Sequence, residues 1–187
     1  MQILTAKFRT LEFSETKTYL AAALFVLGNI ALPQLCHMVH AGGPTWLPIY
    51  FFTLVAAYKY GWRTGLLTAV ASPLANSLLF GMPVAAMLPA ILLKSVVLAL
   101  AAGWAAAHYR RASLLLLAGV VLASQGIGTL GEWALTGDLQ AAAQDFRLGL
   151  PGMLLQVFGG WAVINRMDMQ RLPKRRRDEK TNPSNRK

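Results

Sequence analysis

The chain has 187 residues, of which 55% are hydrophobic and 14% are charged, whereas an average soluble domain carries about 25% charged residues. This composition argues against a soluble domain and favours one compact unit embedded in a membrane. The net charge of +10 does not indicate a nucleic-acid-binding face, because the basic residues lie at the chain ends and in short gaps between apolar runs. One cysteine excludes a framework of intrachain disulfides.

Apolar runs separated by short polar gaps follow one another along the chain. A hydrocarbon core about 30 Å thick requires about 17–25 helical residues to cross it. Six runs meet or approach this length, the second being short: residues 18–35, 44–58, 61–79, 83–107, 112–130 and 148–164. None shows the alternation of a membrane β-barrel. The sequence predicts an all-α integral membrane protein, with a six-transmembrane-helix bundle over residues 18–165. A cytoplasmic segment, residues 1–17, precedes the bundle, and a basic disordered cytoplasmic tail, residues 166–187, follows it.

The positive charges give the predicted orientation of this bundle. Basic residues precede the first run, separate the second from the third and the fourth from the fifth, and follow the sixth. The other three gaps contain one basic residue, Arg147, beside Glu132, Asp138 and Asp145. By the positive-inside rule, both the N and C termini are predicted to be cytoplasmic. This alternation also requires the short second run to cross the membrane.

The segment LPQLCHMVHAGGPTWLP, residues 32–48, lies in the first outward-facing gap. It carries the only cysteine, Cys36, and two of the three histidines, His37 and His40. A thiolate and imidazoles suit a transition metal or the metal of a macrocyclic cofactor. However, Cys36 and His37 are adjacent and no second Cys/His cluster exists, so a structural zinc site is not predicted. The preferred hypothesis is a lid over a ligand pocket, with direct ligand contact as an extension and a plain connector as the alternative.

Prolines gather in the outward half of the predicted bundle or near its midplane. Seven of the nine lie in or beside the apolar runs: Pro33, Pro44, Pro48, Pro73, Pro83, Pro89 and Pro151. Proline interrupts a helix, and in lipid the freed backbone groups must be satisfied by protein or by a cavity. The pattern therefore predicts irregular backbone around a cavity. The alternative, that prolines mark helix ends, explains Pro33, Pro44 and Pro83 but not Pro73 or Pro89.

Polar side chains within the runs show the same outward bias. Asn76 lies near the outer end of the third run, and Gln156 lies in the sixth. Gln125, Thr129 and Glu132 are spaced four and three residues apart, so they share one helix face. Polar groups in hydrocarbon are costly and often mark a substrate path. Together they favour a pocket, although hydrogen bonding that only holds helices together is the alternative.

Lys94 is a charged residue about ten residues into the fourth run, near the predicted mid-bilayer. A lysine there costs about 2.5–3.5 kcal/mol on insertion scales. The fourth run enters from outside, and helical side chains lean toward the N-terminus, so Lys94 is expected to reach outward. It is expected to pair with Glu132 or to bind an anionic or carbonyl group of a ligand. A structural ion pair or a snorkelling lysine is the alternative.

The central part of the chain resembles a known family. The run LPIYFFTLVAAYKYGWRTGLLTAVASPLANSLLFGMPVAAMLPAILLKS, with its YGWRTG turn and FGMP loop, is similar to the substrate-binding S component of an energy-coupling factor (ECF) transporter. The resemblance covers about residues 18–165. It implies high-affinity capture of a vitamin or related micronutrient from outside the bacterial cytoplasmic (inner) membrane. It also implies a membrane coupling subunit and two ATPase subunits as partners, and loops at residues 36–46 and 80–83 that cap the ligand.

A corrinoid such as cobalamin is the leading specific ligand, with Cys36 or His40 as a candidate axial ligand to its metal. Its wide pocket would be lined by aromatic side chains: Trp46, Tyr50, Phe51, Phe80 and Trp133. No catalytic residue, intrinsic cofactor or protein metal site is predicted. The predicted substrate-binding residues are Cys36, His37, His40, Trp46, Tyr50, Asn76, Phe80, Met82, Lys94, Gln125, Thr129 and Glu132.

Two other functions stay open at this point. The sequence has no P-loop, nucleotide-binding fingerprint, H-E-x-x-H motif or nucleophile elbow, so neither ATP hydrolysis nor enzymatic activity is expected. The first alternative is an integral-membrane enzyme or assembly protein that acts on a lipid or cofactor through Lys94 and Glu132. The second is a stand-alone carrier. The sequence does not identify the substrate.

Overall fold

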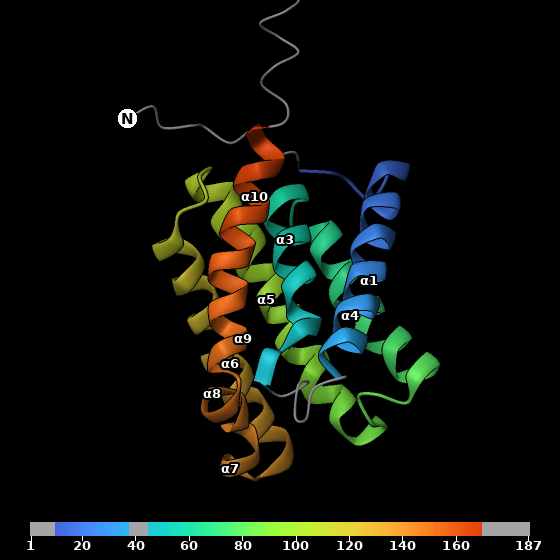
Figure 1. The fold of residues 1–187 in the computed structure, drawn as a ribbon, viewed down its shortest axis with the longest axis vertical. Helices are drawn as coiled ribbons and strands as arrows, with labels where there is room; N and C mark the ends of the chain where they lie inside the picture. The colour runs from blue at the N-terminus through green and yellow to red at the C-terminus, as the bar shows by residue number, and fades with distance from the viewer. Residues whose placement is uncertain (1–9, 38–44, 170–187) are drawn as a thin grey trace, which may run out of the picture.

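The computed structural model describes residues 10–37 and 45–169, and within these ranges it is helical with connecting turns and no strand (Figure 1). The elements are α1 (Thr16–His37), η1 (Pro48–Tyr50), α3 (Phe51–Tyr60), α4 (Trp62–Phe80), η2 (Ala85–Met87), α5 (Leu88–Tyr109), α6 (Leu114–Thr136), α7 (Leu139–Ala142), α8 (Gln144–Leu148), α9 (Leu150–Leu154), η3 (Leu155–Gly159) and α10 (Gly160–Met169). η3 is a π-helical turn between α9 and α10. The predicted N-terminal segment and tail fall largely outside the described residues.

The longer helical segments lie side by side and alternate in direction. In Figure 1, α1, α4 and α6 run downward, whereas α3, α5 and the combined α9–η3–α10 run upward. α5 packs against both α4 and α6, and α3 packs against α1, α4 and α5. The prediction of an all-helical bundle is confirmed for the described residues.

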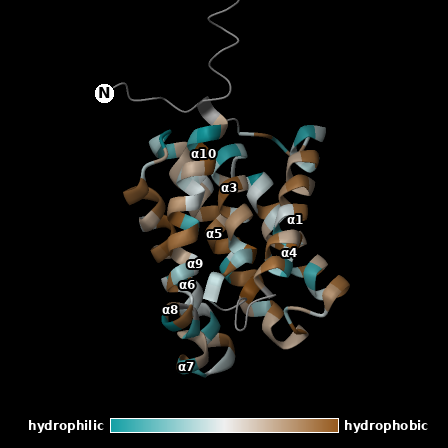
Figure 2. Ribbon diagram, viewed as in Figure 1, coloured by the Kyte–Doolittle hydropathy of each residue, from teal (hydrophilic) through white to brown (hydrophobic). Residues whose placement is uncertain are grey.

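Three helical stretches are long and apolar enough to cross a membrane: Thr16–Cys36, Ala85–Tyr109 and Leu114–Thr136. This finding supports the prediction of a membrane protein with transmembrane helices. The crossing of α3, α4 and the α9–η3–α10 run, and with it the six-span topology, stays a prediction. Figure 2 shows the hydrophilic residues gathered mainly toward the two ends of the bundle.

α3 is short but occupies the centre of the bundle. Leu54, Val55 and Tyr58 each have 0% of their surface exposed, because neighbouring helices cover every side of α3. Close packing on α4 requires a glycine: a Cβ at Gly65 would lie 2.4 Å from the Cβ of Ala57. Small residues in the second and third apolar runs therefore bring these two helices into contact along their backbones.

The positions of Pro33 and Pro89 differ from prediction, whereas that of Pro73 agrees with it. Pro33 lies inside α1, which continues to His37, so the first residues of the predicted 32–48 loop are helical. Pro73 lies inside α4, as its position in the third run indicated. Pro89 lies in the first turn of α5, where proline is well tolerated, so the helix-end explanation fits it after all.

The described basic residues gather at one end of the bundle, the upper end in Figure 1. Six of the eight described lysines and arginines lie there, at the ends of helices or in their turns: Lys17, Lys59, Arg63, Arg110, Arg111 and Arg166. Lys94 and Arg147 lie toward the other end. This is the charge distribution on which the predicted orientation depends.

Candidate ligand-binding cavity

A cavity of about 390 Å³ lies at the end of the bundle opposite the basic residues. The segments around it are the late part of α1, η1, the end of α4, the loop before α5, the start of α5, the end of α6, α7 and α8. The lining residues are Pro33, Leu47, Pro48, Ile49, Tyr50, Asn76, Met82, Pro83, Val84, Met87, Ala90, Ile91, Lys94, Glu132, Ala141 and Gln144.

The short second segment accounts for the position of this cavity. η1 and α3 together run from Pro48 to Tyr60, or 13 residues, which is roughly 20 Å of helix. A hydrocarbon core is about 30 Å thick, so this central segment is roughly 10 Å shorter than a helix that spans it. The residues at its start, from Leu47 to Tyr50, line the cavity.

The chain takes a tight path into η1. Leu47 adopts a left-handed conformation with φ 45°, which is uncommon for a residue with a side chain. α9 covers this turn closely, since a Cβ at Gly152 would lie 2.4 Å from the carbonyl of Trp46. Glycine at position 152 therefore allows the last helical run to hold the turn before η1 in place.

Lys94 and Glu132 form an ion pair in the cavity wall. Lys94 Nζ lies 2.5 Å from Glu132 Oε2, and the two side chains are 6% and 17% exposed. The lysine stem lies against α6, because a Cβ at Gly128 would be 2.5 Å from Lys94 Cγ. The expected turn of Lys94 toward Glu132 is confirmed. Lys94 is the tenth residue of the helical stretch Ala85–Tyr109, as expected, and its depth in a bilayer stays a prediction.

A group of buried polar side chains between the cavity and the basic end of the bundle joins α1, α3 and α4. Asn29 Nδ2 donates to the Oγ atoms of Thr53 and Ser72, both at 3.1 Å. Asn29 Oδ1 accepts from the backbone N–H of Phe52 at 3.1 Å, which satisfies a donor in the first turn of α3. Asn76 Nδ2 donates to the carbonyl oxygens of Asn29 and Ser72, at 2.9 and 3.0 Å. The start of α3 is thus fixed to both neighbouring helices.

Five of the predicted site residues come together in the cavity wall, although they belong to η1, α4, the following loop, α5 and α6. They are Tyr50, Asn76, Met82, Lys94 and Glu132. Their convergence follows from alternating helix directions, which bring the end of α4 and of α6 beside the start of η1 and of α5.

The other predicted residues lie elsewhere. Gln125 and Thr129 are buried on α6 outside the lining, and Trp46 and Phe80 are 40% and 48% exposed. Cys36 is half-buried near the end of α1 and does not line the cavity. His40 and the side chain of His37 are outside the described part of the chain.

The predicted aromatic wall is not found. Phe51 and Trp133 join Trp46 and Phe80 outside the lining, which leaves Tyr50 as the one aromatic residue among the described lining residues. Aliphatic and methionine side chains take their place, because the loop after α4 turns Met82, Val84 and Met87 toward the cavity.

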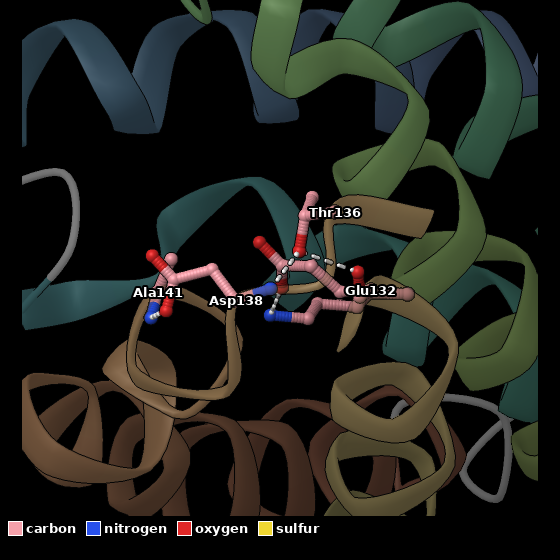
Figure 3. A network of polar contacts seen from close by, with 5 residues as sticks. Glu132, Thr136, Asp138 and Ala141 are labelled. Carbon is pink, nitrogen blue, oxygen red and sulfur yellow. Dashed lines mark hydrogen bonds and ion pairs between the residues drawn. The ribbon is translucent and has the colours of Figure 1, made fainter. Parts of the chain in front are cut away.

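The sequence interpretation missed α7 and α8, which contribute Ala141 and Gln144 to the wall. Gly137, with φ 72°, ends α6, and Asp138 Oδ1 then accepts from the N–H groups of Gln140 and Ala141. Figure 3 shows these contacts continuing through Thr136, whose hydroxyl donates to the carbonyl of Glu132 at 2.8 Å. A glycine followed by an aspartate is a recognisable helix stop and start, so this pair was the available signal.

Comparison of the chain with protein-family models, with curated proteins and with solved structures finds no match. The resemblance to ECF S components therefore depends on the sequence features given above.

Proposed function

We propose that this protein is a membrane-embedded binding subunit that captures a vitamin or related micronutrient from the outer side of a bacterial cytoplasmic membrane. In this proposal six segments cross the membrane, both termini are cytoplasmic, and the cavity opens outward. The gathering of the described basic residues at the opposite end supports this orientation, since such residues favour the cytoplasmic side.

The cavity is the observation that carries the proposal. Small-molecule sites usually have volumes of about 300–1,000 Å³, apolar walls and a few polar groups that orient the ligand. The cavity described above has about 390 Å³, a mainly aliphatic wall, and a few polar lining residues that include Asn76, Lys94 and Glu132. Its chemistry and its position suit capture of a ligand.

The cavity volume also bears on the ligand. At about 390 Å³ the space suits a compact vitamin, whereas a corrinoid with its peripheral side chains is considerably larger. A corrinoid would require the walls to move apart, and Cys36, the candidate axial ligand, lies outside the lining. The volume therefore favours a ligand smaller than cobalamin. As a capture subunit, the protein would work with the coupling subunit and the two ATPases that the ECF resemblance implies.

The proposal is tested by ligand binding to the purified full chain in lipid nanodiscs. The probes are thiamine, riboflavin, biotin, pantothenate, pyridoxine, folate, lipoate and cyanocobalamin, measured by equilibrium dialysis and by thermal stabilisation. We expect at least one probe to bind with a Kd below about 1 μM, with no chemical change to the ligand. Failure of every probe to bind a folded protein would contradict the proposal.

The same experiment separates the alternatives. An enzyme acting through Lys94 and Glu132 would convert its ligand, which mass spectrometry of the recovered probe would detect. A stand-alone carrier would take up the bound probe in cells that lack coupling ATPases, whereas a capture subunit would not.

A further inference from the structure

Asn76 contributes an unpartnered hydrogen-bond acceptor to the cavity wall. Its side chain is 1% exposed, and its Nδ2 atom donates to two carbonyl oxygens, those of Asn29 and Ser72. These two acceptors fix the orientation of the amide, because the reverse orientation would place its oxygen against both carbonyls. The Oδ1 atom has no hydrogen-bond partner among the described residues. A buried acceptor of this kind requires a donor. Asn76 is among the residues that line the cavity, and a ligand N–H would reach its Oδ1 once the side chains that cover this atom move slightly.

The charges in the wall balance each other. Lys94 and Glu132 are paired at 2.5 Å, and the other described lining residues carry no formal charge. A ligand carboxylate would compete with Glu132 for Lys94 and would leave two buried carboxylates sharing one cation. A ligand ammonium would leave two cations sharing one carboxylate. Because a buried charge is costly unless it is paired, the wall favours a ligand with no net charge.

The rest of the wall is shaped for an aliphatic surface. Leu47, Met82, Val84, Met87 and Ile91 line it beside several prolines and alanines. Flat aromatic ligands gain from stacking on aromatic side chains, and Tyr50 is the one such residue among the described lining residues. Flexible methionines instead adapt to irregular aliphatic shapes.

We propose that the cavity takes an uncharged ligand with an aliphatic or alicyclic body and an amide-type N–H group, which donates a hydrogen bond to Asn76 Oδ1. This inference rests on the proposed function, since it names the class of ligand for the same cavity. Asn76 thereby determines specificity: it distinguishes carboxamides and ureas that present an N–H from the corresponding carboxylic acids and from N-alkylated amides.

Matched ligand pairs test the inference on the unaltered protein. The pairs are biotinamide with biotin, lipoamide with lipoate, panthenol with pantothenate, and cyanocobalamin with its monocarboxylic acid. In every pair that binds, we expect the uncharged member to bind at least tenfold more tightly. For lipoamide, whose only N–H donors are those of its carboxamide, N,N-dimethylation should weaken binding at least tenfold, because it removes the donor and keeps the carbonyl. For a ligand with further N–H groups, such as biotinamide, the dimethyl derivative is also methylated at each of those nitrogens.

A pair of variants on α4 provides the protein-side test. Asn76→Leu removes the acceptor and should abolish the difference between an amide and its dimethyl derivative. Thr68→Val, two turns away on the same helix, removes a buried hydroxyl that bonds to Thr64 and does not line the cavity, so the difference should persist. If Asn76→Leu does not fold, the dimethylated ligand measured on the unaltered protein still decides the question.

Each outcome separates this inference from the proposed function. Tighter binding of a carboxylate, or equal binding of an amide and its dimethyl derivative, would overturn the inference and leave the function standing. Binding confined to thiamine, riboflavin, folate or pyridoxine would do the same, because these ligands are aromatic or charged. If no probe from either set binds the folded protein, the proposed function fails as well.

Discussion

Lys94 and Glu132 form an ion pair in the wall of the cavity. The two side chains are 6% and 17% exposed, and the stem of Lys94 lies against α6 at Gly128. Burial removes the hydration of both charges, so each depends on the other for compensation. Any ligand that enters the cavity meets the pair as one dipole and not as two separate charges.

Removing both members of the pair should cost less than the sum of the two single removals. Breaking a buried pair typically costs about 3–5 kcal/mol, because one charge is left without its partner. We expect Glu132→Gln and Lys94→Met each to lower the free energy of unfolding by an amount toward this range, and the double variant to lose less than their sum. Unfolding in mixed micelles measures all three. Strictly additive effects would show that the two residues do not interact.

Asn29 is the buried residue whose importance is least visible in the sequence. It lies in an apolar run and has 0% of its surface exposed, yet it bonds to both Thr53 and Ser72 and to the N–H of Phe52. A buried donor or acceptor that loses its partner costs about 1–3 kcal/mol. Asn29→Leu should therefore lower the unfolding temperature and loosen the start of α3. A thermal transition unchanged from wild type would show that these bonds contribute nothing.

At the scale of elements, α3 and α4 depend on close backbone approach. A Cβ at Gly65 would lie 2.4 Å from the Cβ and 2.8 Å from the Cα of Ala57, so neither atom can move aside by a side-chain rotation. The central helix is therefore held by small residues, and the larger ones on its other faces fill the core.

The substitution Gly65→Ala should overpack this contact and cost about 1–3 kcal/mol. Gly126→Ala provides a control on α6, since a Cβ there would meet no atom within 4 Å. The control should be neutral or stabilising by up to about 1 kcal/mol, because alanine is the better helix former. Thermal unfolding of both variants in detergent compares them. Equal effects would mean that α3 and α4 do not pack as closely as described.

Much of the helical framework could be predicted from the sequence, because each apolar run extends over many residues and the basic residues recur in alternate gaps between the runs. The Lys94–Glu132 pair followed from helix direction and spacing on α6. The hydrogen bonds of Asn29 could not be predicted, since they join three segments far apart in the chain. α7 and α8 were missed because helices of four and five residues are too short to show a periodic pattern. The prediction of an aromatic wall was wrong, because the position of an aromatic residue in the sequence does not determine which side of a loop its ring occupies.

At the scale of the whole molecule, the proposed orientation makes the two ends of α6 lie on opposite sides of the membrane. In a Cys36→Ser background, a membrane-impermeant thiol reagent should label Thr136→Cys in intact cells. It should label Arg111→Cys, at the other end, only after permeabilisation; the adjacent Arg110 keeps a positive charge at that end. Mass spectrometry of the modified protein gives the result. The reverse pattern would invert the topology.

The short central helix has a consequence for motion. Toward the basic end, Val55, Ala57 and Tyr58 are enclosed on every side, whereas the opposite end is built from short helices and turns, including α7 and α8. Backbone amides open most easily where few apolar contacts must break. Deuterium should therefore exchange into the backbone amides of residues 137–149 much sooner than into those of residues 54–60. Bound ligand should slow this exchange mainly in residues 137–149. The end of the bundle that contains the cavity would therefore open locally to admit a ligand, while the basic end stays rigid.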